Sequence, residues 1–182
     1  MAMEKTDNPQ GLPWSVPVAV EDIPASGLHI EIAAPAATLA ELAALASVRD
    51  LARLSAAFDL TREGAKVHIA GHVVARVEQN CVVTLEPIEQ DVAEVVDVTF
   101  AAVPADKVPA EIEVQVDKEP PEPLVDGKVD LGALATEFLV LGVDPYPRKS
   151  DATFTPPAVE NAEAHPFAAL EALKKPPGGG KP

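Results

Sequence analysis

The feature that most constrains this chain is a long stretch in which apolar and polar residues alternate with a period of two. Between residues 66 and 78, one side carries small or branched apolar residues and the other carries mostly polar ones. The apolar series is Val67, Ile69, Gly71, Val73, Ala75 and Val77. Successive side chains of a strand point to opposite faces, so this stretch predicts a long strand with one buried face and one wet face. Such alternation is typical of antiparallel sheets.

Shorter stretches with the same alternation predict the other strands. They lie within residues 14–20, 28–32, 54–60, 92–100 and 112–116. The sequence therefore predicts an α+β fold built on a curved or partly closed antiparallel sheet of about six strands, with two or three short helices.

Two helices are predicted inside this domain. Thr38 and Glu41 have the spacing of a capping box at the start of a helix over 39–47. Asp130 is a suitable N-cap for a helix over 131–141, and Gly142 is a suitable stop. The second helix carries Leu131, Leu134, Phe138 and Leu141 on one face. We expect Val67, Ile69, Val73, Phe100, Leu134 and Phe138 to be buried together.

The composition divides the chain into three parts. Residues 1–12 are polar and predict a disordered N-terminus, residues 13–149 predict a single domain, and residues 150–182 predict a flexible tail. No run of apolar residues is long enough to span a membrane, and the first residues do not have the pattern of a secretory signal. With one cysteine in 182 residues, a reducing cytoplasmic location is expected.

The tail contains one apolar stripe, which predicts a short helix over 166–175. Its members are Phe167, Leu170 and Leu173. About ten residues are too few for a stable helix alone in water, so the stripe must dock on something. It can dock on the protein's own sheet, or it can present these side chains to a groove on a partner.

The chain is strongly acidic, with 29 Asp and Glu side chains against 14 Lys and Arg and a formal net charge of −15. Nucleic-acid binders usually show the opposite balance, because contacts with phosphates drive their affinity. The charge has two interpretations. It can serve solubility alone, or it can attract a basic partner such as a ribosomal protein.

No residue pattern predicts catalysis or metal binding. His68 and His72 fall on the polar face of the predicted strand, about 13 Å apart, too far to share a metal. Cys81 has no candidate base beside it in the sequence. The neighbouring carboxylates Glu78 and Glu86 are expected to raise the pKa of its thiol. We therefore expect a structural thiol and a protein that is not an enzyme.

One short segment combines an aromatic residue with basic charge, in the proline-rich stretch after the second helix. It contains Tyr146, Arg148 and Lys149. In one interpretation Tyr146 packs back on the sheet and the two basic residues are exposed. In the other, the three residues contact RNA or a protein partner, because tyrosine can stack on a base while Arg and Lys bind phosphates.

Three pieces of the sequence resemble the YceD-like family, the large ribosomal RNA subunit accumulation proteins. They are Gly71–Val77 leading to Cys81, Leu85–Pro87, and Glu137–Leu141 leading to Pro145 and Pro147. The resemblance covers roughly residues 14–155. Many members carry Cys-x-x-Cys where this chain has Cys81 to Thr84, and another cysteine where it has Arg148 and Lys149. One thiolate cannot make a four-ligand zinc site, so no metal or cofactor is expected here.

The resemblance implies a bacterial ribosome-biogenesis factor that supports accumulation or processing of large-subunit (23S) ribosomal RNA without catalysing a reaction. Its implied partners are large-subunit components, either the RNA or a basic ribosomal protein. No membrane or small-molecule partner is expected. The alternative is an acidic binding module or chaperone for one basic protein. The oligomeric state stays open.

Overall fold

The computed structural model describes residues 11–64, 66–102, 121–124 and 126–156. The chain divides into two units, residues 1–152 and 153–182, and every described helix and strand belongs to the first. In chain order the elements are β1 (Pro17–Ala19), the 3-10 helix η1 (Val20–Asp22), β2 (Leu28–Ala33), α1 (Leu39–Leu45), β3 (Asp50–Glu63), β4 (Lys66–Asn80), β5 (Pro87–Ala101), β6 (Glu122–Pro123), β7 (Lys128–Asp130) and α2 (Leu131–Gly142).

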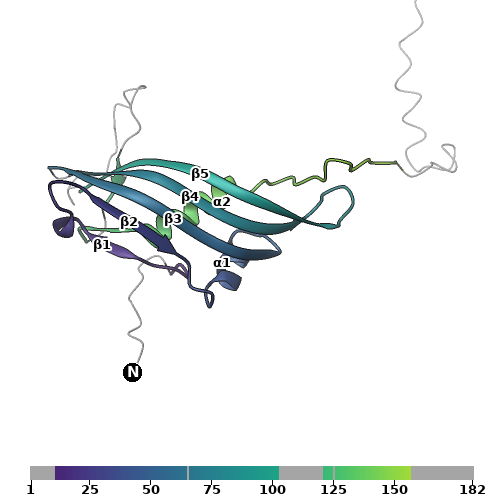
Figure 1. The fold of residues 1–182 in the computed structure, drawn as a ribbon, viewed down its shortest axis with the longest axis horizontal. Coiled ribbons are helices and arrows are strands. Elements are labelled where there is room, and N and C mark those ends of the chain that lie inside the picture. Colours follow the sequence, from purple (N-terminus) through teal and green to yellow (C-terminus); the bar gives the residue numbers. More distant parts are fainter. Residues whose placement is uncertain (1–10, 65, 103–120, 125, 157–182) are drawn as a thin grey trace, which may run out of the picture. The chain divides into compact units, whose positions relative to one another are not determined.

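The main sheet has five strands in the order β2-β3-β4-β5-β6 (Figure 1). Strands β2 to β5 pair antiparallel, whereas the short β6 runs parallel to the end of β5. The predicted α+β class and the long central strand are confirmed. The sheet is not closed. It is mixed because β6 pairs parallel to β5, at Phe100 and Ala101. The predicted strand at 112–116 lies outside the described residues.

A second, two-stranded sheet pairs β1 with β7. The sequence predicted a strand over residues 14–20, but only residues 17–19 are paired, and Val20 begins η1 instead. This small sheet brings residues near the N-terminus against the start of α2, more than a hundred residues later.

The first helix, α1, forms where the sequence predicted it, but its cap is different. Thr38 does precede the helix, yet its hydroxyl donates to the carbonyl of Pro35 at 2.9 Å and caps no helical N–H. The predicted capping box was therefore wrong. The reason is the backbone of Thr38, which is already helical, with φ −97° and ψ −12°. A residue whose side chain caps the first turn of a helix usually has an extended backbone.

The second helix, α2, begins with a strong cap. Asp130 is extended, and its Oδ1 accepts from the N–H groups of Gly132 and Ala133 at 3.0 Å each. The predicted N-cap is confirmed. The same carboxylate also accepts from the N–H of Val16 at 2.8 Å and from the hydroxyl of Ser15. One side chain therefore starts the helix and fixes the N-terminal segment beside it.

The burial of α2 differs from the predicted single stripe. Residues Leu131 to Thr136 are all buried, so the first half of the helix is enclosed on every side. Leu139 is buried while Leu141 is 76% exposed, although the sequence placed Leu141 on the inner face. Gly142 is still helical and does not stop the helix by a left-handed turn. A Cβ there would lie 2.6 Å from side-chain atoms of Val92 and Glu94, so glycine permits a close approach to β5.

The core lies between the main sheet and α2, which packs on the side of the sheet that faces away in Figure 1. Val67, Ile69, Val73 and Leu134 are buried as predicted. Phe100 and Phe138 belong to the same cluster but are only partly buried. The other side of β2 to β5 is wet, so the alternation in the sequence reports the two faces correctly.

Gly71 on β4 lies opposite Phe58 on β3, where the strands leave no room for a side chain. A Cβ at this position would lie 2.1 Å from the carbonyl oxygen of Ala57 and 3.0 Å from Phe58. Backbone cannot move aside as a flexible side chain can, so overpacking here should strain the sheet.

We predict that Gly71→Ala lowers the free energy of unfolding by about 1–3 kcal/mol, the usual cost of an overpacked core position. Urea unfolding measures it. The matched control is Ala70→Ser, which adds one atom at the neighbouring residue on the wet face. Equal stabilities for the two variants would contradict the close approach.

Candidate functional site

The candidate site lies where the β4–β5 hairpin turns. Asn80 and Pro87 form the last pair of the ladder. Beyond it, the N–H of Cys81 donates to the carbonyl of Glu86, and the N–H of Leu85 donates to the carbonyl of Cys81, both at 2.8 Å. Leu85 has φ +61°, a left-handed conformation that costs energy in a large side chain. The turn is therefore compact, and it holds one residue in a strained conformation.

The segment after α2 is attached to this turn by hydrogen bonds and an ion pair. Gln79 Nε2 donates to the carbonyl of Asp144 at 2.9 Å, and the N–H of Val82 donates to the carbonyl of Pro147 at 2.9 Å. The ammonium of Lys149 forms an ion pair with Glu86. Hairpin turn and proline-rich segment are thus one structural unit, which we call the hairpin-end site (residues 81–86 and 144–149).

Cys81 lies at the centre of this unit and is fully buried. The Thr84 side chain and the backbone N–H groups of Lys149, Thr84 and Val83 hydrogen-bond its sulfur, and together they lower the pKa of the thiol from 9.0 to about 6. The expectation that carboxylates would raise this pKa was wrong. Four donors surround the sulfur, and the charge of Glu86 is paired with Lys149, which lowers the pKa of Glu86 in turn.

The residues around Cys81 do not fit the zinc site that the cysteine-rich relatives suggest. Thr84 stands at the second cysteine position and offers a hydroxyl, while Lys149 brings a cation close to the sulfur. In the part of the chain that the structure describes, no group of three or more His, Cys, Asp or Glu side chains is placed to hold a metal ion. The chemistry of this donor set favours a hydrogen-bonded thiolate.

The outer surface of the hairpin-end site is apolar and partly basic. Leu85 is 75% exposed and Tyr146 is 71% exposed, and Val82 and Arg148 are also exposed. The N–H of Tyr146 donates to Asp144 Oδ1 at 2.8 Å, which holds the tyrosine on its turn. We call these four side chains, Val82, Leu85, Tyr146 and Arg148, the hairpin-end patch.

The three residues singled out from the sequence have different environments. Tyr146 points outward, so the interpretation in which it packs back on the sheet was wrong. Arg148 is exposed, whereas Lys149 is paired with Glu86, whose bond and charge raise the pKa of the lysine. The ammonium of Lys149 therefore stabilises the hairpin-end site through this ion pair, and its charge is largely neutralised. Phe167, Leu170 and Leu173 lie outside the described residues.

Sequence reasoning missed Gln79 and the contribution of Val82 and Leu85. Gln79 falls at a buried position of β4, in register with Val77 and Ala75 on the inner face, and is 7% exposed. A polar residue at the end of an apolar series was a signal that a buried hydrogen bond is needed there. Its Oε1 has no hydrogen-bond partner within the described part of the chain.

His29, His68 and His72 lie apart from the hairpin-end site, on the wet face of the sheet. His29 bonds Asp59 at 2.7 Å, and His68 bonds Asp97 at 2.8 Å. The bond to Asp59 raises the pKa of His29. Within the described residues, no helix is long and apolar enough to cross a membrane.

We predict that the stability of this protein depends on pH through Cys81. In the folded chain the thiol loses its proton near pH 6, whereas in the unfolded chain it keeps it until about pH 9.0. Between these values the unfolded state binds more protons, so stability rises with pH. Relative to Cys81→Ser, the natural protein should gain free energy of unfolding from about pH 6 to pH 9.

Two measurements check this prediction. The ultraviolet absorbance of the thiolate should titrate near pH 6 in the natural protein. Thr84→Val removes the strongest donor and should move that midpoint upward. Parallel pH profiles for the natural protein and Cys81→Ser would show that the thiol stays protonated in the fold.

Comparison with known proteins places the chain. The family model described as large ribosomal RNA subunit accumulation protein YceD matches residues 69–174, more than half of the 182-residue chain. Searches of curated proteins and of solved structures gave no match. The matched region begins on β4, includes the whole hairpin-end site, and continues through the apolar stripe at 166–175 as far as residue 174. The chain belongs to the YceD family of large ribosomal RNA subunit accumulation proteins.

Proposed function

We propose that this protein is a non-enzymatic ribosome-biogenesis factor that supports accumulation or processing of 23S ribosomal RNA in the bacterial cytoplasm. The family match carries the proposal, since the family is named for an effect on the amount of large-subunit RNA and not for a reaction. The hairpin-end patch is the surface that we assign to this function.

Three properties support this surface. It joins two segments about sixty residues apart through Val82 and Pro147, and both segments lie within the family match. It exposes an aromatic ring and an arginine two positions apart in the sequence, a combination that can stack on an unpaired base and bind a phosphate. It also keeps Leu85 strained and exposed, which is typical of contact residues.

A protein partner is the second candidate, and the charge favours it. A chain with net charge −15 repels RNA outside a limited contact patch, whereas it attracts basic proteins. Many large-subunit components are basic proteins, so an acidic binding module for one of them would also support RNA accumulation. Pull-down at increasing salt separates the candidates, because one stoichiometric basic protein without RNA favours the module.

We predict that deletion of the gene lowers the ratio of large- to small-subunit ribosomal RNA, and that the natural gene restores it. The double variant Tyr146→Ala, Arg148→Ala should restore it poorly. Loss of one stacked base costs about 1–3 kcal/mol, enough to weaken binding roughly ten-fold. Tyr146→Phe is the matched control, since it keeps the ring.

Two results would contradict these assignments, and they differ. An unchanged RNA ratio after deletion, under both slow and fast growth, overturns the proposed function. Full restoration by the double variant, at equal protein level, overturns only the hairpin-end patch.

We further propose that Phe167, Leu170 and Leu173 form a partner-docking helix over residues 166–175. The family match extends through these residues, which supports a role beyond a free tail. Truncation after Ala158 should leave the melting temperature unchanged and reduce restoration of the RNA ratio. A fall of several degrees would show instead that the segment stabilises the domain.

A further inference from the structure

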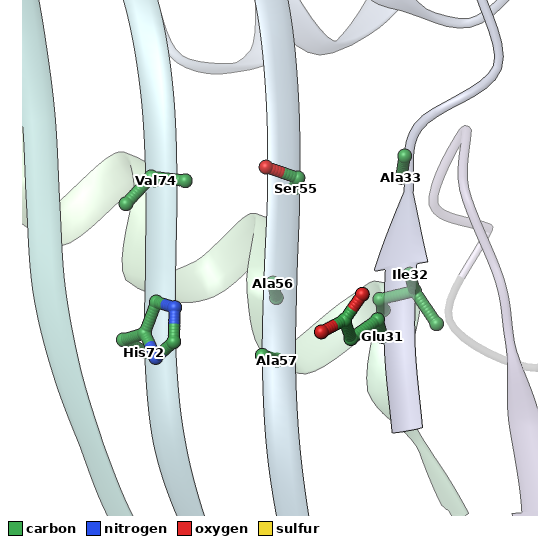
Figure 2. Close-up of a pocket in the computed structure, with 8 residues that line it drawn as sticks. All are labelled: Glu31, Ile32, Ala33, Ser55, Ala56, Ala57, His72 and Val74. Carbon is green, nitrogen blue, oxygen red and sulfur yellow. The ribbon is translucent and has the colours of Figure 1, made fainter. Parts of the chain in front are cut away.

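The side of the main sheet opposite α2 is uncovered in the part of the chain that the structure describes. Figure 2 shows this side: Ser55, His72 and Val74 stand on it, and α2 lies behind the strands. We call it the open face, and it consists of the even-numbered residues of β4 from His68 to Arg76 with their cross-strand neighbours on β2, β3 and β5. Val95, next to His72, is 79% exposed there.

A shallow hollow of about 380 Å³ lies on this face. Its lining includes Ser55, Ala57 and Val74, whose short side chains leave room between the taller His72 and Glu31 (Figure 2). Apolar atoms cover only slightly more of the walls than polar atoms do. The rim carries the carboxylate of Glu31, whose side chain is 81% exposed. A hollow that combines the apolar side chains of Ala57 and Val74 with an acidic rim suits the aliphatic stem and charged head of a lysine or arginine.

The charges of the open face are unequally distributed along the strands. At one end Arg76 bonds Glu89 and Asp91 at 2.6 and 2.8 Å, and Arg53 lies 3.6 Å from Asp91. These arginines and carboxylates largely neutralise one another. That end therefore attracts no partner of either sign strongly.

Three exposed carboxylates, Glu31, Asp59 and Asp97, lie from the middle of the face, where Glu31 is in register with Ala57 and His72, towards the other end, and we call this group the acidic end. Their partners in the structure are His29 and His68, which are neutral when unprotonated and then leave the carboxylate charges uncompensated. Asp59 and Asp97 both flank Ala70 across neighbouring strands, about 10 Å apart by the spacing of strands. The next cation along β4 is Lys66, which is opposite Glu63.

We propose that the open face binds an extended lysine- and arginine-rich segment of a protein partner, with one cationic side chain in the hollow and others on the acidic end. Charge selects this occupant. A second copy related by a two-fold axis through the acidic end would place three carboxylates against three, and a nucleic acid would place phosphates against them. This proposal rests on the proposed function in one respect: that function identifies the natural partner as a large-subunit protein. Binding of a basic segment to the open face does not depend on it.

The test measures binding of a fluorescein-labelled peptide of alternating arginine and alanine to the full chain by fluorescence anisotropy. The pH is about 9, well above the ordinary imidazole pKa of about 6.5, because Asp59 raises the pKa of His29. The triple variant Glu31→Gln, Asp59→Asn, Asp97→Asn should weaken binding about ten-fold or more. The matched control, Glu21→Gln, Asp22→Asn, Glu41→Gln, changes the net charge equally, with exposed residues of η1 and α1. It should weaken binding less than about two-fold.

A steric variant tests the hollow separately. Ala57→Leu should fill the hollow, and leucine is tolerated at this half-buried strand position. It should weaken binding of the peptide more than the control Thr61→Val does. Neither substitution changes the charge. Equal losses for the two triple variants would overturn the proposal, because attraction would then follow net charge alone. So would amide shifts that map the peptide to the hairpin-end site. Peptide binding with an unchanged RNA ratio after deletion would overturn the proposed function and leave the open face intact.

Discussion

The arrangement of this protein depends on the carboxylate of Asp130. It caps α2 through Gly132 and Ala133, and it holds Ser15 and Val16 beside the first turn. Because the first half of α2 is enclosed on all sides, the position and direction of the helix can vary little. Its far end must then reach β4, where Gln79 binds Asp144. The position of the proline-rich segment on the hairpin turn is therefore a consequence of a cap formed about fourteen residues earlier.

The alternation in β3, β4 and β5 separates stability from recognition. Inward residues such as Val67 and Val73 are buried in the same core cluster as residues of α2 and contribute the burial that stabilises the fold. Outward residues such as His72 and Val95 contribute little to it, so their identity is free to serve binding. A sheet covered by helices on both faces would need apolar residues on both. This chain keeps charges on one side, which is uncovered in the part of the chain that the structure describes.

Local patterns were enough to predict most of the fold. The period of two in residues 66–78 and the cap at Asp130 depend on neighbours in the sequence, and both predictions were confirmed. The same kind of reasoning failed at Thr38, where a capping-box spacing formed no cap, because the backbone there is helical. It also failed at Leu141, which is exposed in the last turn of the helix, whereas Leu139 is buried.

The site was harder to predict because its contacts join distant residues. The pKa of Cys81 depends on Lys149, and the N–H of Val82 donates to the carbonyl of Pro147, next to Tyr146. No window of neighbouring residues contains both partners of either contact. The sequence shows the acidic neighbours of Cys81, but it does not show that Lys149 forms an ion pair with Glu86.

The same contacts explain how the hairpin-end site can persist without cysteine ligands for a metal. Cys-x-x-Cys and a later cysteine in the relatives that the sequence resembles would join the hairpin turn to the proline-rich segment. Here one backbone hydrogen bond, one ion pair and the N–H of Lys149 on the sulfur of Cys81 join the same two segments. The ion pair is partly exposed and contributes little by itself. The buried contacts of Cys81 and Gln79 must therefore provide most of the attachment, which is why the protonation of a single thiol can be expected to affect this end of the protein.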